Sequence, residues 1–200
     1  MRIGIAKTET TELVAKSIKE TLSDAGFEVF YFKNGSKVTM ADLVIVLGGD
    51  RGVRNYFHTA LDVDTPVLGI SESESNGVLA QIELKELPSY LSRIKNQDYV
   101  IEDVPRIGVK IDGKNTYPVL NDVAVFTSKS ATLMEHILRV NGEEVWHDSS
   151  DGIIISTPIG SSAYSLSAGG PVIFQAANVF GIISVNSLDI TRRPIIVSDN

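Results

Sequence analysis

The chain has 200 residues, a formal net charge of −7 at pH 7, 43% hydrophobic residues and no cysteine. Its length suits one large or two small domains, and the absence of cysteine excludes disulfides, thiol catalysis and cysteine-ligated metals. The negative charge argues against an extended nucleic-acid surface. Because the sequence shows no signal peptide and no apolar run near the roughly 18 residues of a membrane span, we expect a cytoplasmic protein with no membrane or nucleic-acid partner.

Strand and helix signals alternate in the first half of the chain. A helix is expected between Thr10 or Thr11, either of which can cap it, and Gly26, which ends it. The run 43–47 is apolar on both faces, as in a parallel sheet covered by helices. The other expected elements are strands at 2–6, 27–32 and 66–70 and a helix at 51–61. This alternation predicts an α/β fold with an open, mostly parallel sheet and flanking helices.

The second half changes to a β-rich pattern. Asp112-Gly113 and Asn141-Gly142 each separate two strand-like runs, which is the signature of a hairpin. The hairpin runs are 107–111 with a strand through Tyr117, and 132–140 with 143–147; further strands are expected at 123–127, 152–156, 179–185 and 195–197. We therefore predict an α/β domain over residues 1–95 and a β-rich, sandwich-like domain over residues 96–200. Pro88 and the polar run 95–98 are the linker candidates.

Two glycines and an aspartate follow the buried strand at 43–47. In parallel sheets, ligands bind beyond the carboxyl ends of the strands. Gly48 and Gly49 leave room for a phosphate or a ribose, and Asp50 would present a carboxylate to it. Taken alone, Gly-Gly-Asp is a weak signal, and an aspartate that only forms the turn is the alternative.

The segment from Asp151 to Pro171 is rich in glycine, hydroxyl side chains and proline. Its strand breaks at Thr157-Pro158, because proline cannot donate to a ladder. Ser161 and Ser162 can cap a short following helix, whose first amides would point at a ligand, and Tyr164 offers a flat face to a base. The run suits close backbone approach to a nucleotide; on composition alone, a Gly/Ser-rich turn between two strands is the alternative.

Together these motifs resemble the NAD kinases, which phosphorylate the adenosine ribose of NAD to make NADP. The family pattern is Gly-Gly-Asp-Gly, then Asn-Glu, then Asp-Gly, Thr-Pro-Thr-Gly-Ser-Thr-Ala-Tyr, Gly-Gly-Pro and a late Arg-Pro. The matching pieces here are Gly48-Gly49-Asp50-Arg51, Asn121-Asp122, Asp151-Gly152, Thr157-Pro158-Ile159-Gly160-Ser161-Ser162-Ala163-Tyr164, Gly169-Gly170-Pro171 and Arg193-Pro194. Their order and rough spacing match over nearly the whole chain.

The resemblance implies a role for each motif. Phosphoryl transfer needs an aligned nucleophile and neutralised charge, and Asp50 would be the base or the group that orients the hydroxyl. Asn121 and Asp122 would hold ribose hydroxyls of NAD, and Asp151 would contact the nicotinamide end. The implied adenine-binding residues are Thr157, Ser162, Ala163 and Tyr164, with Gly49 and Ser167 also contacting NAD. Gly48 and Arg51 would lie near the phosphoryl donor.

The resemblance also implies cofactors and assembly. The donor would be ATP or inorganic polyphosphate, with Mg²⁺ bridging its phosphates. The active site would lie between the two domains. The protein would be a homodimer or homotetramer in which a neighbouring subunit completes the adenine site.

Several positions depart from the family pattern. Arg51 stands where the fourth glycine is expected, Gly52 replaces a threonine, and Asp122 is one methylene shorter than glutamate. The segment 71–76 is polar and acidic, and Ser187-Leu188 stands in the place of Pro-His. Family chains usually continue past the Arg-Pro, so we expect either a natural short form or a missing piece. A guanidinium beside Asp50 would weaken it as a base, or would instead stabilise charge on the donor.

Two other functions stay open. One is a non-catalytic NAD or NADP binder with a degenerate donor site, which Arg51 and the altered segment 71–76 favour. The other is a lipid kinase that shares the Gly-Gly-Asp-Gly turn, although no membrane-facing segment supports it. The sequence contains no Gly-x-Gly-x-x-Gly after its first strand and no P-loop lysine pattern. His58, His136 and His147 lack metal-ligand spacing.

Overall fold

The computed structural model describes residues 1–7, 12–33, 40–60, 63–72 and 77–199. It divides into two compact units, Met1–Asp103 and Val104–Asn200. The division falls eight residues after the predicted boundary. Pro88, one linker candidate, lies instead in the first turn of a helix, Leu87–Lys95. Within the described ranges, no helix is long and apolar enough to cross a membrane.

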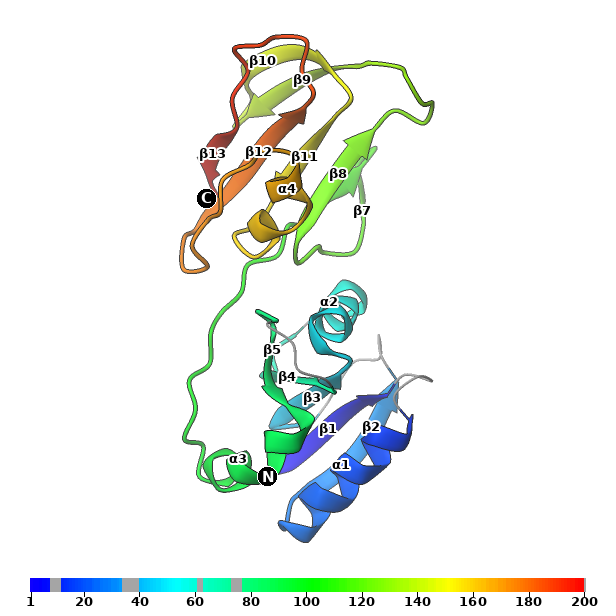
Figure 1. Ribbon diagram of the computed structural model, residues 1–200, viewed down its shortest axis with the longest axis vertical. Coiled ribbons are helices and arrows are strands. Elements are labelled where there is room, and N and C mark those ends of the chain that lie inside the picture. Colours follow the sequence, from blue (N-terminus) through cyan, green and yellow to red (C-terminus); the bar gives the residue numbers. More distant parts are fainter. Residues whose placement is uncertain (8–11, 34–39, 61–62, 73–76, 200) are drawn as a thin grey trace. The chain divides into compact units, whose positions relative to one another are not determined.

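Unit 1 is a five-stranded parallel sheet with helices between its strands (Figure 1). The strand order is β2-β1-β3-β4-β5, and all four pairs are parallel. The elements are β1 (Arg2–Lys7), α1 (Glu12–Asp24), β2 (Glu28–Lys33), β3 (Leu43–Leu47), α2 (Gly49–Thr59), β4 (Val67–Ser71), β5 (Ala80–Glu83), the 3₁₀ turn η2 (Leu84–Glu86) and α3 (Leu87–Lys95). The predicted α/β fold with a parallel sheet is confirmed, and α2 begins two residues earlier than expected.

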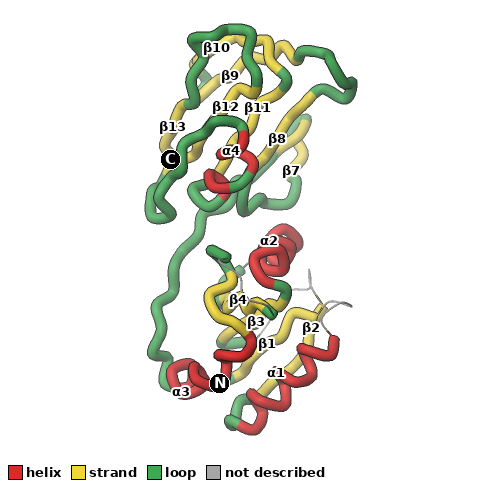
Figure 2. The backbone as a smooth tube through the Cα atoms, in the orientation of Figure 1, coloured by secondary structure: helices red, strands yellow, loops and turns green. Residues whose placement is uncertain are grey.

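Both faces of this sheet are buried, as the apolar run of β3 predicts. Leu43, Ile45 and Leu47 share a core cluster with residues of α1 and α3. Val44 and Val46 point the other way and pack with α2, because successive side chains of a strand alternate between faces. Helices α1 and α3 therefore cover one face of the sheet and α2 covers the other (Figure 2).

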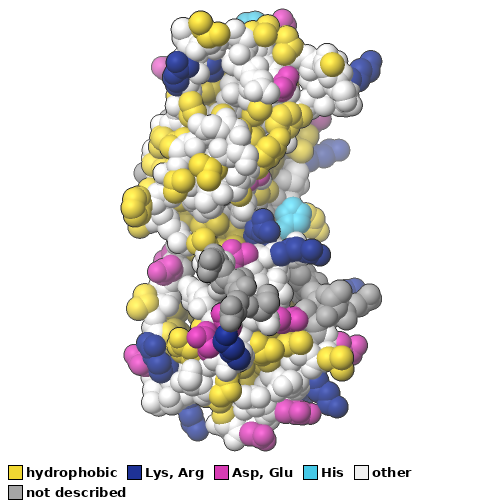
Figure 3. Space-filling view, in the orientation of Figure 1, with side chains coloured by type: hydrophobic (Ala, Val, Ile, Leu, Met, Phe, Trp, Pro, Cys, Tyr) yellow, Lys and Arg dark blue, Asp and Glu magenta, His cyan; other side chains and the backbone are white. Residues whose placement is uncertain are grey.

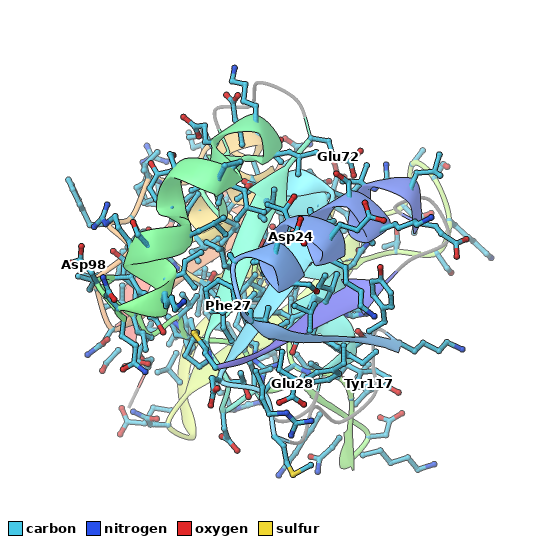
Figure 4. The ribbon with its side chains drawn as sticks, turned by 90° about the horizontal axis from the view of Figure 1, so that it is seen from below. Asp24, Phe27, Glu28, Glu72, Asp98 and Tyr117 are labelled. Carbon is cyan, nitrogen blue, oxygen red and sulfur yellow. The ribbon has the colours of Figure 1, made fainter. Side chains whose placement is uncertain are left out.

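Helix α1 ends at Asp24, just before Gly26, the residue predicted to end it. Gly26 has a φ of +86°, its N–H donates to the Ser23 carbonyl at 2.9 Å, and the Phe27 N–H donates to the Leu22 carbonyl at 3.1 Å. These two bonds form a Schellman cap, which a glycine at positive φ favours. Phe27 then lies between α1 and α3 (Figure 4) and joins their core cluster. The expected amino-terminal caps, Thr10 and Thr11, lie outside the described residues.

Unit 2 is built from antiparallel strands. A four-stranded sheet has the order β13-β12-β11-β8, and β9-β10 and β6-β7 form two-stranded sheets. The elements are β6 (Lys110–Ile111), β7 (Lys114–Asn115), β8 (Asp122–Phe126), β9 (Met134–Val140), β10 (Glu143–Ser150), β11 (Gly152–Ser156), η3 (Gly160–Ser162), α4 (Tyr164–Ser167), β12 (Val179–Val185) and β13 (Ile195–Ser198). Trp146 of β10 packs with Ile153 and Ile182 of the larger sheet, so the two sheets share a core. The predicted β-rich second half is confirmed.

The two hairpin turns adopt the backbone conformation that their sequences demand. Asp112 and Gly113 have φ values of +50° and +77°, and Asn141 and Gly142 have +53° and +87°. Two consecutive residues at positive φ are typical of the type I′ turn, which matches the twist of the flanking strands. Both hairpins are confirmed, although β6 and β7 have only two residues each.

Candidate functional site

The Gly48-Gly49-Asp50 turn lies at the carboxyl edge of the parallel sheet, directly after β3. The φ values of Gly48 and Gly49 are +92° and +63°, a region in which side chains are strained. The strand order reverses between β1 and β3, and ligands of open α/β sheets bind at the carboxyl ends of strands at such a switch point. Unit 1 thus places this turn where a nucleotide is expected.

The Asp50 carboxylate lies in the first turn of α2 and accepts three backbone hydrogen bonds. Oδ2 accepts the N–H of Val78 at 2.9 Å, and Oδ1 accepts those of Leu79 and Ala80 at 3.0 and 2.8 Å. Hydrogen bonds to a charged acceptor are the stronger kind. Asp50 therefore holds residues 78–80, which lead into β5, in place. The sequence did not reveal this structural role. Its predicted role toward a ribose hydroxyl stays a prediction.

Arg51 and Gly52 stand where the family pattern has glycine and then threonine. The Arg51 side chain is exposed. A Cβ atom at Gly52 would lie 1.9 Å from the Leu47 carbonyl oxygen, closer than any real contact. The first turn of α2 therefore requires a glycine at position 52, one residue later than in the family pattern, because the Leu47 carbonyl at the end of β3 leaves no room for a side chain there.

In unit 2, Thr157 follows β11 and forms hydrogen bonds with the residues that precede β8. It is fully buried, and its hydroxyl donates to the Leu120 carbonyl at 2.6 Å and accepts the Gly160 N–H at 3.0 Å. Its own N–H donates to the Asn121 carbonyl at 2.8 Å. The polar atoms of Thr157 thus bond to other parts of the protein, and its predicted contact with an adenine stays a prediction.

Asn121 is held so closely that only glycine fits beside it. A Cβ atom at Gly160 would lie 1.9 Å from the Asn121 carbonyl oxygen. The side-chain oxygen Oδ1 of Asn121 is buried, and no described residue donates a hydrogen bond to it. A buried acceptor without a donor costs about 1–3 kcal/mol. Asp122, the next residue, opens β8 and pairs with Ser156 of β11.

Ser161 and Ser162 do not cap the following helix, contrary to expectation. The N-cap residue of α4 is Ala163, which makes no side-chain cap bond. The Ser161 hydroxyl is buried and donates to the Pro158 carbonyl at 2.6 Å, and that of Ser162 donates to the Ile159 carbonyl at 3.1 Å. In a tight 3₁₀ turn such short hydroxyl side chains fold back onto earlier carbonyls. Ser161 also accepts the Ile173 N–H at 2.9 Å.

Tyr164 is half-exposed, and its ring stacks on that of Phe126. The ring centroids are 5.9 Å apart at an interplanar angle of 22°, and Tyr164 is 48% exposed. Phe126 was not among the predicted site residues. Ala163 and Ser167 flank Tyr164 on the same short segment, and exposed hydrophobic side chains gather around α4 and the loop that leads to β12 (Figure 3).

Asp151 lies at the opposite end of β11 from Thr157. Six residue steps along a strand cover roughly 20 Å. The Asn186 amide nitrogen donates to Asp151 Oδ2 at 2.7 Å. The unit 2 residues thus form two groups, one around Asn121 and Thr157 and one around Asp151, and an elongated ligand is needed to reach both.

Asp148 is the charged residue that sequence reasoning missed. It is only 5% exposed and accepts hydrogen bonds from Ser184 and Ser187 at 2.6 and 2.7 Å, with Arg192 at 3.3 Å. Burial raises the pKa of Asp148, but the serine hydroxyls, the Arg192 charge and the Ser149 N–H outweigh it and hold this pKa below its usual 3.8. The signal in the sequence was the alternation of Trp146, Asp148 and Ser150 along one face of β10.

The described part of the chain contains no group of three histidine, cysteine, aspartate or glutamate side chains that could hold a metal ion. His136 instead accepts the Trp146 indole N–H through Nε2 at 3.2 Å.

Comparison with known protein families identifies the class of protein. Residues 7–99 match the ATP-NAD kinase N-terminal domain, and residues 120–200 match the ATP-NAD kinase C-terminal domain. The chain is 36% identical to an NAD kinase of Clostridium perfringens over 202 residues, covering 97% of this chain and 72% of that protein. It is 31% identical to an NAD kinase of Methanopyrus kandleri, covering 78% of this chain and 56% of the relative.

Solved structures of related kinases have the same fold. The crystal structure of an NAD kinase from Archaeoglobus fulgidus in complex with ATP matches with a TM-score of 0.80 at 27% identity, over 99% of this chain and 77% of that one. Yeast NADH kinase complexed with NADH matches with a TM-score of 0.75 at 18% identity, over 99% of this chain and 69% of that one, and shares the fold. The chain belongs to the NAD kinase family.

Proposed function

We propose that this protein is an NAD kinase, which transfers a phosphoryl group from ATP or polyphosphate to the 2′-hydroxyl of the adenosine ribose of NAD and forms NADP. The observation that carries the proposal is the buried Oδ1 atom of Asn121, which has no donor among the described residues. A hydroxyl or amino group of a bound nucleotide supplies that donor and removes the cost of leaving the acceptor unpaired. Membership of the NAD kinase family supports this choice of ligand.

The residues of unit 2 bind NAD in this proposal. Asn121 and Asp122 contact ribose hydroxyls, and the outer face of Tyr164 stacks on the adenine, beside Ser162, Ala163 and Ser167. Asp151 contacts the nicotinamide end. The separation of the two groups along β11 suits an extended dinucleotide, because such a ligand has recognisable groups at both of its ends. Thr157 acts by holding Asn121 in place.

The turn at the edge of unit 1 serves the phosphoryl transfer. Gly48 and Gly49 admit phosphates close to the backbone, and the exposed Arg51 contacts the donor. Asp50 orients the acceptor hydroxyl through lone pairs that its three backbone donors leave free, since each carboxylate oxygen accepts more than one hydrogen bond. Positioning and charge neutralisation are the main contributions that a protein makes to this reaction.

Donor and metal are further parts of the proposal. An NAD kinase of Archaeoglobus fulgidus with this fold was solved in complex with ATP, which supports ATP as the donor; polyphosphate is the alternative. Mg²⁺ commonly keeps several waters and binds through substrate phosphates and one or two carboxylates. Asp50 is the carboxylate of this turn that could contribute, and the ion would neutralise charge on the transferred group.

A homodimer or homotetramer in the cytoplasm completes the proposal. Light scattering on the purified protein measures the number of subunits, and cell fractionation measures its location. A monomer at working concentration, or a membrane-bound pool, would contradict these parts without affecting the proposed reaction.

The test of the reaction is NADP formation from NAD, Mg²⁺ and either ATP or polyphosphate. Asp50→Asn is compared with Asp112→Asn, which makes the same change in the exposed β6–β7 turn, where asparagine tolerates the positive φ. We expect turnover by the wild type and by Asp112→Asn, and a loss of about 10²-fold or more for Asp50→Asn. Equal rates in all three proteins would exclude the role of Asp50.

A non-catalytic NAD or NADP binder is the second candidate, favoured by one observation. Both oxygens of the Asp50 carboxylate are engaged by backbone N–H groups, and Arg51 replaces the neighbouring glycine of the pattern. Calorimetric binding of NAD or NADP without turnover, with either donor and at any Mg²⁺ concentration, would establish this function in place of the kinase.

A further inference from the structure

The buried carboxylate of Asp148 is central to the contacts between β10 and the connection from β12 to β13. Asp148 accepts the Ser187 hydroxyl at 2.7 Å and pairs with Arg192 at 3.3 Å, and these residues lie near the two ends of the connection. The Leu188 N–H adds a bond to the Ser149 carbonyl at 2.9 Å. The segment 186–192 is therefore held at several points, and its first residue has little freedom to move.

That first residue, Asn186, reaches the predicted ligand-binding carboxylate. Its amide nitrogen donates to Asp151 Oδ2 at 2.7 Å, and its φ is +50°, a conformation that asparagine tolerates better than most residues. The Asp151 N–H donates to the Val185 carbonyl at 2.9 Å. Asp151 thus has its backbone fixed by β12 and one carboxylate oxygen fixed by the residue after β12.

The only tryptophan of the chain reports on this arrangement. The Arg192 guanidinium lies over the Trp146 ring, 4.9 Å from its centroid, and the Trp146 indole N–H donates to His136. A displacement of the segment 186–192 changes the position of a cation against the indole. We therefore expect the fluorescence of Trp146 to change when the segment 186–192 moves.

We propose that Asn186 is a positioning residue that orients the Asp151 carboxylate toward NAD, and that Asp148 and Arg192 hold Asn186 in place. The proposal rests on the proposed function, in which Asp151 contacts the nicotinamide end. A neutral amide on Oδ2 leaves Oδ1 to the ligand and fixes the carboxylate plane before binding, so that less rotamer freedom is lost when NAD binds. A lysine or arginine in its place would compete with the ligand for the charge.

Asn186→Gly is the informative variant, because glycine keeps the positive φ and removes only the side chain. Asn141→Gly is its matched control: it makes the same change at a φ of +53° in the β9–β10 turn. We expect Asn186→Gly to raise the KM for NAD about tenfold, the size of one lost hydrogen bond to a charged group, with the KM for ATP unchanged. Asn186→Asp, which places a second carboxylate beside Asp151, should raise the KM for NAD further.

Trp146 emission during an NADP titration supplies a readout that a general loss of stability does not produce. We expect a ligand-dependent change in the wild type and in Asn141→Gly, and a smaller change in Asn186→Gly at saturating NADP. A KM for NAD in Asn186→Gly equal to that of the control overturns the proposal, and so does an equal rise in the KM values for NAD and ATP.

The same variants distinguish a failure of the positioning role of Asn186 from a failure of the proposed kinase activity. If the wild type binds NADP but makes none, the kinase fails while weaker NADP binding by Asn186→Gly than by Asn141→Gly still supports the positioning role; equal binding overturns it. If the wild type neither binds nor turns over NAD or NADP, both proposals fall together.

Discussion

Arg51 is the single residue at which this chain departs most from the family pattern, and its surroundings favour a role in binding the donor. It is exposed, in the first turn of α2, where the partial positive charge of the helix end already favours anions. The requirement for a glycine is met at Gly52, beneath which the Leu47 carbonyl passes. Arg51 is therefore free to contact a phosphate without crowding the backbone.

We expect Arg51→Ala to raise the KM for ATP about three- to tenfold, because one charge-assisted contact with a phosphate is lost, and to leave the KM for NAD unchanged. Steady-state kinetics with each substrate varied in turn measures both values. Arg54→Ala, an exposed arginine one turn along the same helix, is the control. A rate above that of the wild type would mean that Arg51 obstructs the donor.

At the scale of elements, the turn after β11 organises unit 2. Thr157 connects this turn to the residues before β8 through its hydroxyl and its N–H. Ser161, also buried, connects it to the loop before β12 through the Ile173 N–H. The hydroxyl groups of Thr157 and Ser161 thus hold the backbone in shape, and we expect the ligand to contact Asn121, Tyr164 and the exposed residues of α4 instead.

We expect Thr157→Val, which keeps the shape and removes the hydroxyl, to lower the free energy of unfolding by about 2 kcal/mol, because the Gly160 N–H and the Leu120 carbonyl lose a partner. It should also raise the KM for NAD, because Asn121 loses its support. Urea unfolding followed by Trp146 emission measures the first effect, and kinetics the second. Thr116→Val, at an exposed hydroxyl that bonds the Val109 carbonyl, should change neither; an equally small effect of Thr157→Val would contradict this account.

The elements themselves were largely predictable from local pattern. The apolar run of β3 and the turn residues of both hairpins specify their conformations within a few residues, so sheet type and most strands followed from the sequence. The capping role of Ser161 and Ser162 was wrong because their hydroxyls bond earlier carbonyls of a 3₁₀ turn, a choice that composition does not distinguish from capping. The contacts of Asp50 with residues 78–80 and of Asp148 with Ser184 and Arg192 join residues distant in sequence, which no periodicity reveals.

At the scale of the whole molecule, carboxylates in both units join distant parts of the chain. In unit 1, Asp50 links α2 to the approach to β5 through backbone N–H groups. In unit 2, Asp148 links β10, β12 and the connection to β13. Because the pKa of Asp148 is held below its usual value in the folded protein, this carboxylate makes the stability of unit 2 depend on pH.

The Asp148 network makes a prediction about the acid stability of unit 2. The pKa of Asp148 in the folded protein lies below 3.8, its usual value, so the carboxylate stabilises the fold fully above 3.8, and this contribution is lost as the pH falls through the folded pKa. We expect Asp148→Asn to lower the free energy of unfolding by about 3 kcal/mol at pH 7, because Arg192 loses its buried partner, and to reduce the dependence on pH below 3.8.

Urea unfolding followed by Trp146 emission, at a series of pH values, measures this dependence within unit 2. The wild-type and Asp148→Asn curves should converge at the lowest pH, where the wild-type carboxyl is also neutral. Asp112→Asn, in an exposed turn, should follow the wild type throughout. A constant difference between wild type and Asp148→Asn at every pH would mean that the shape of the side chain, and not its charge, holds the connection to β13.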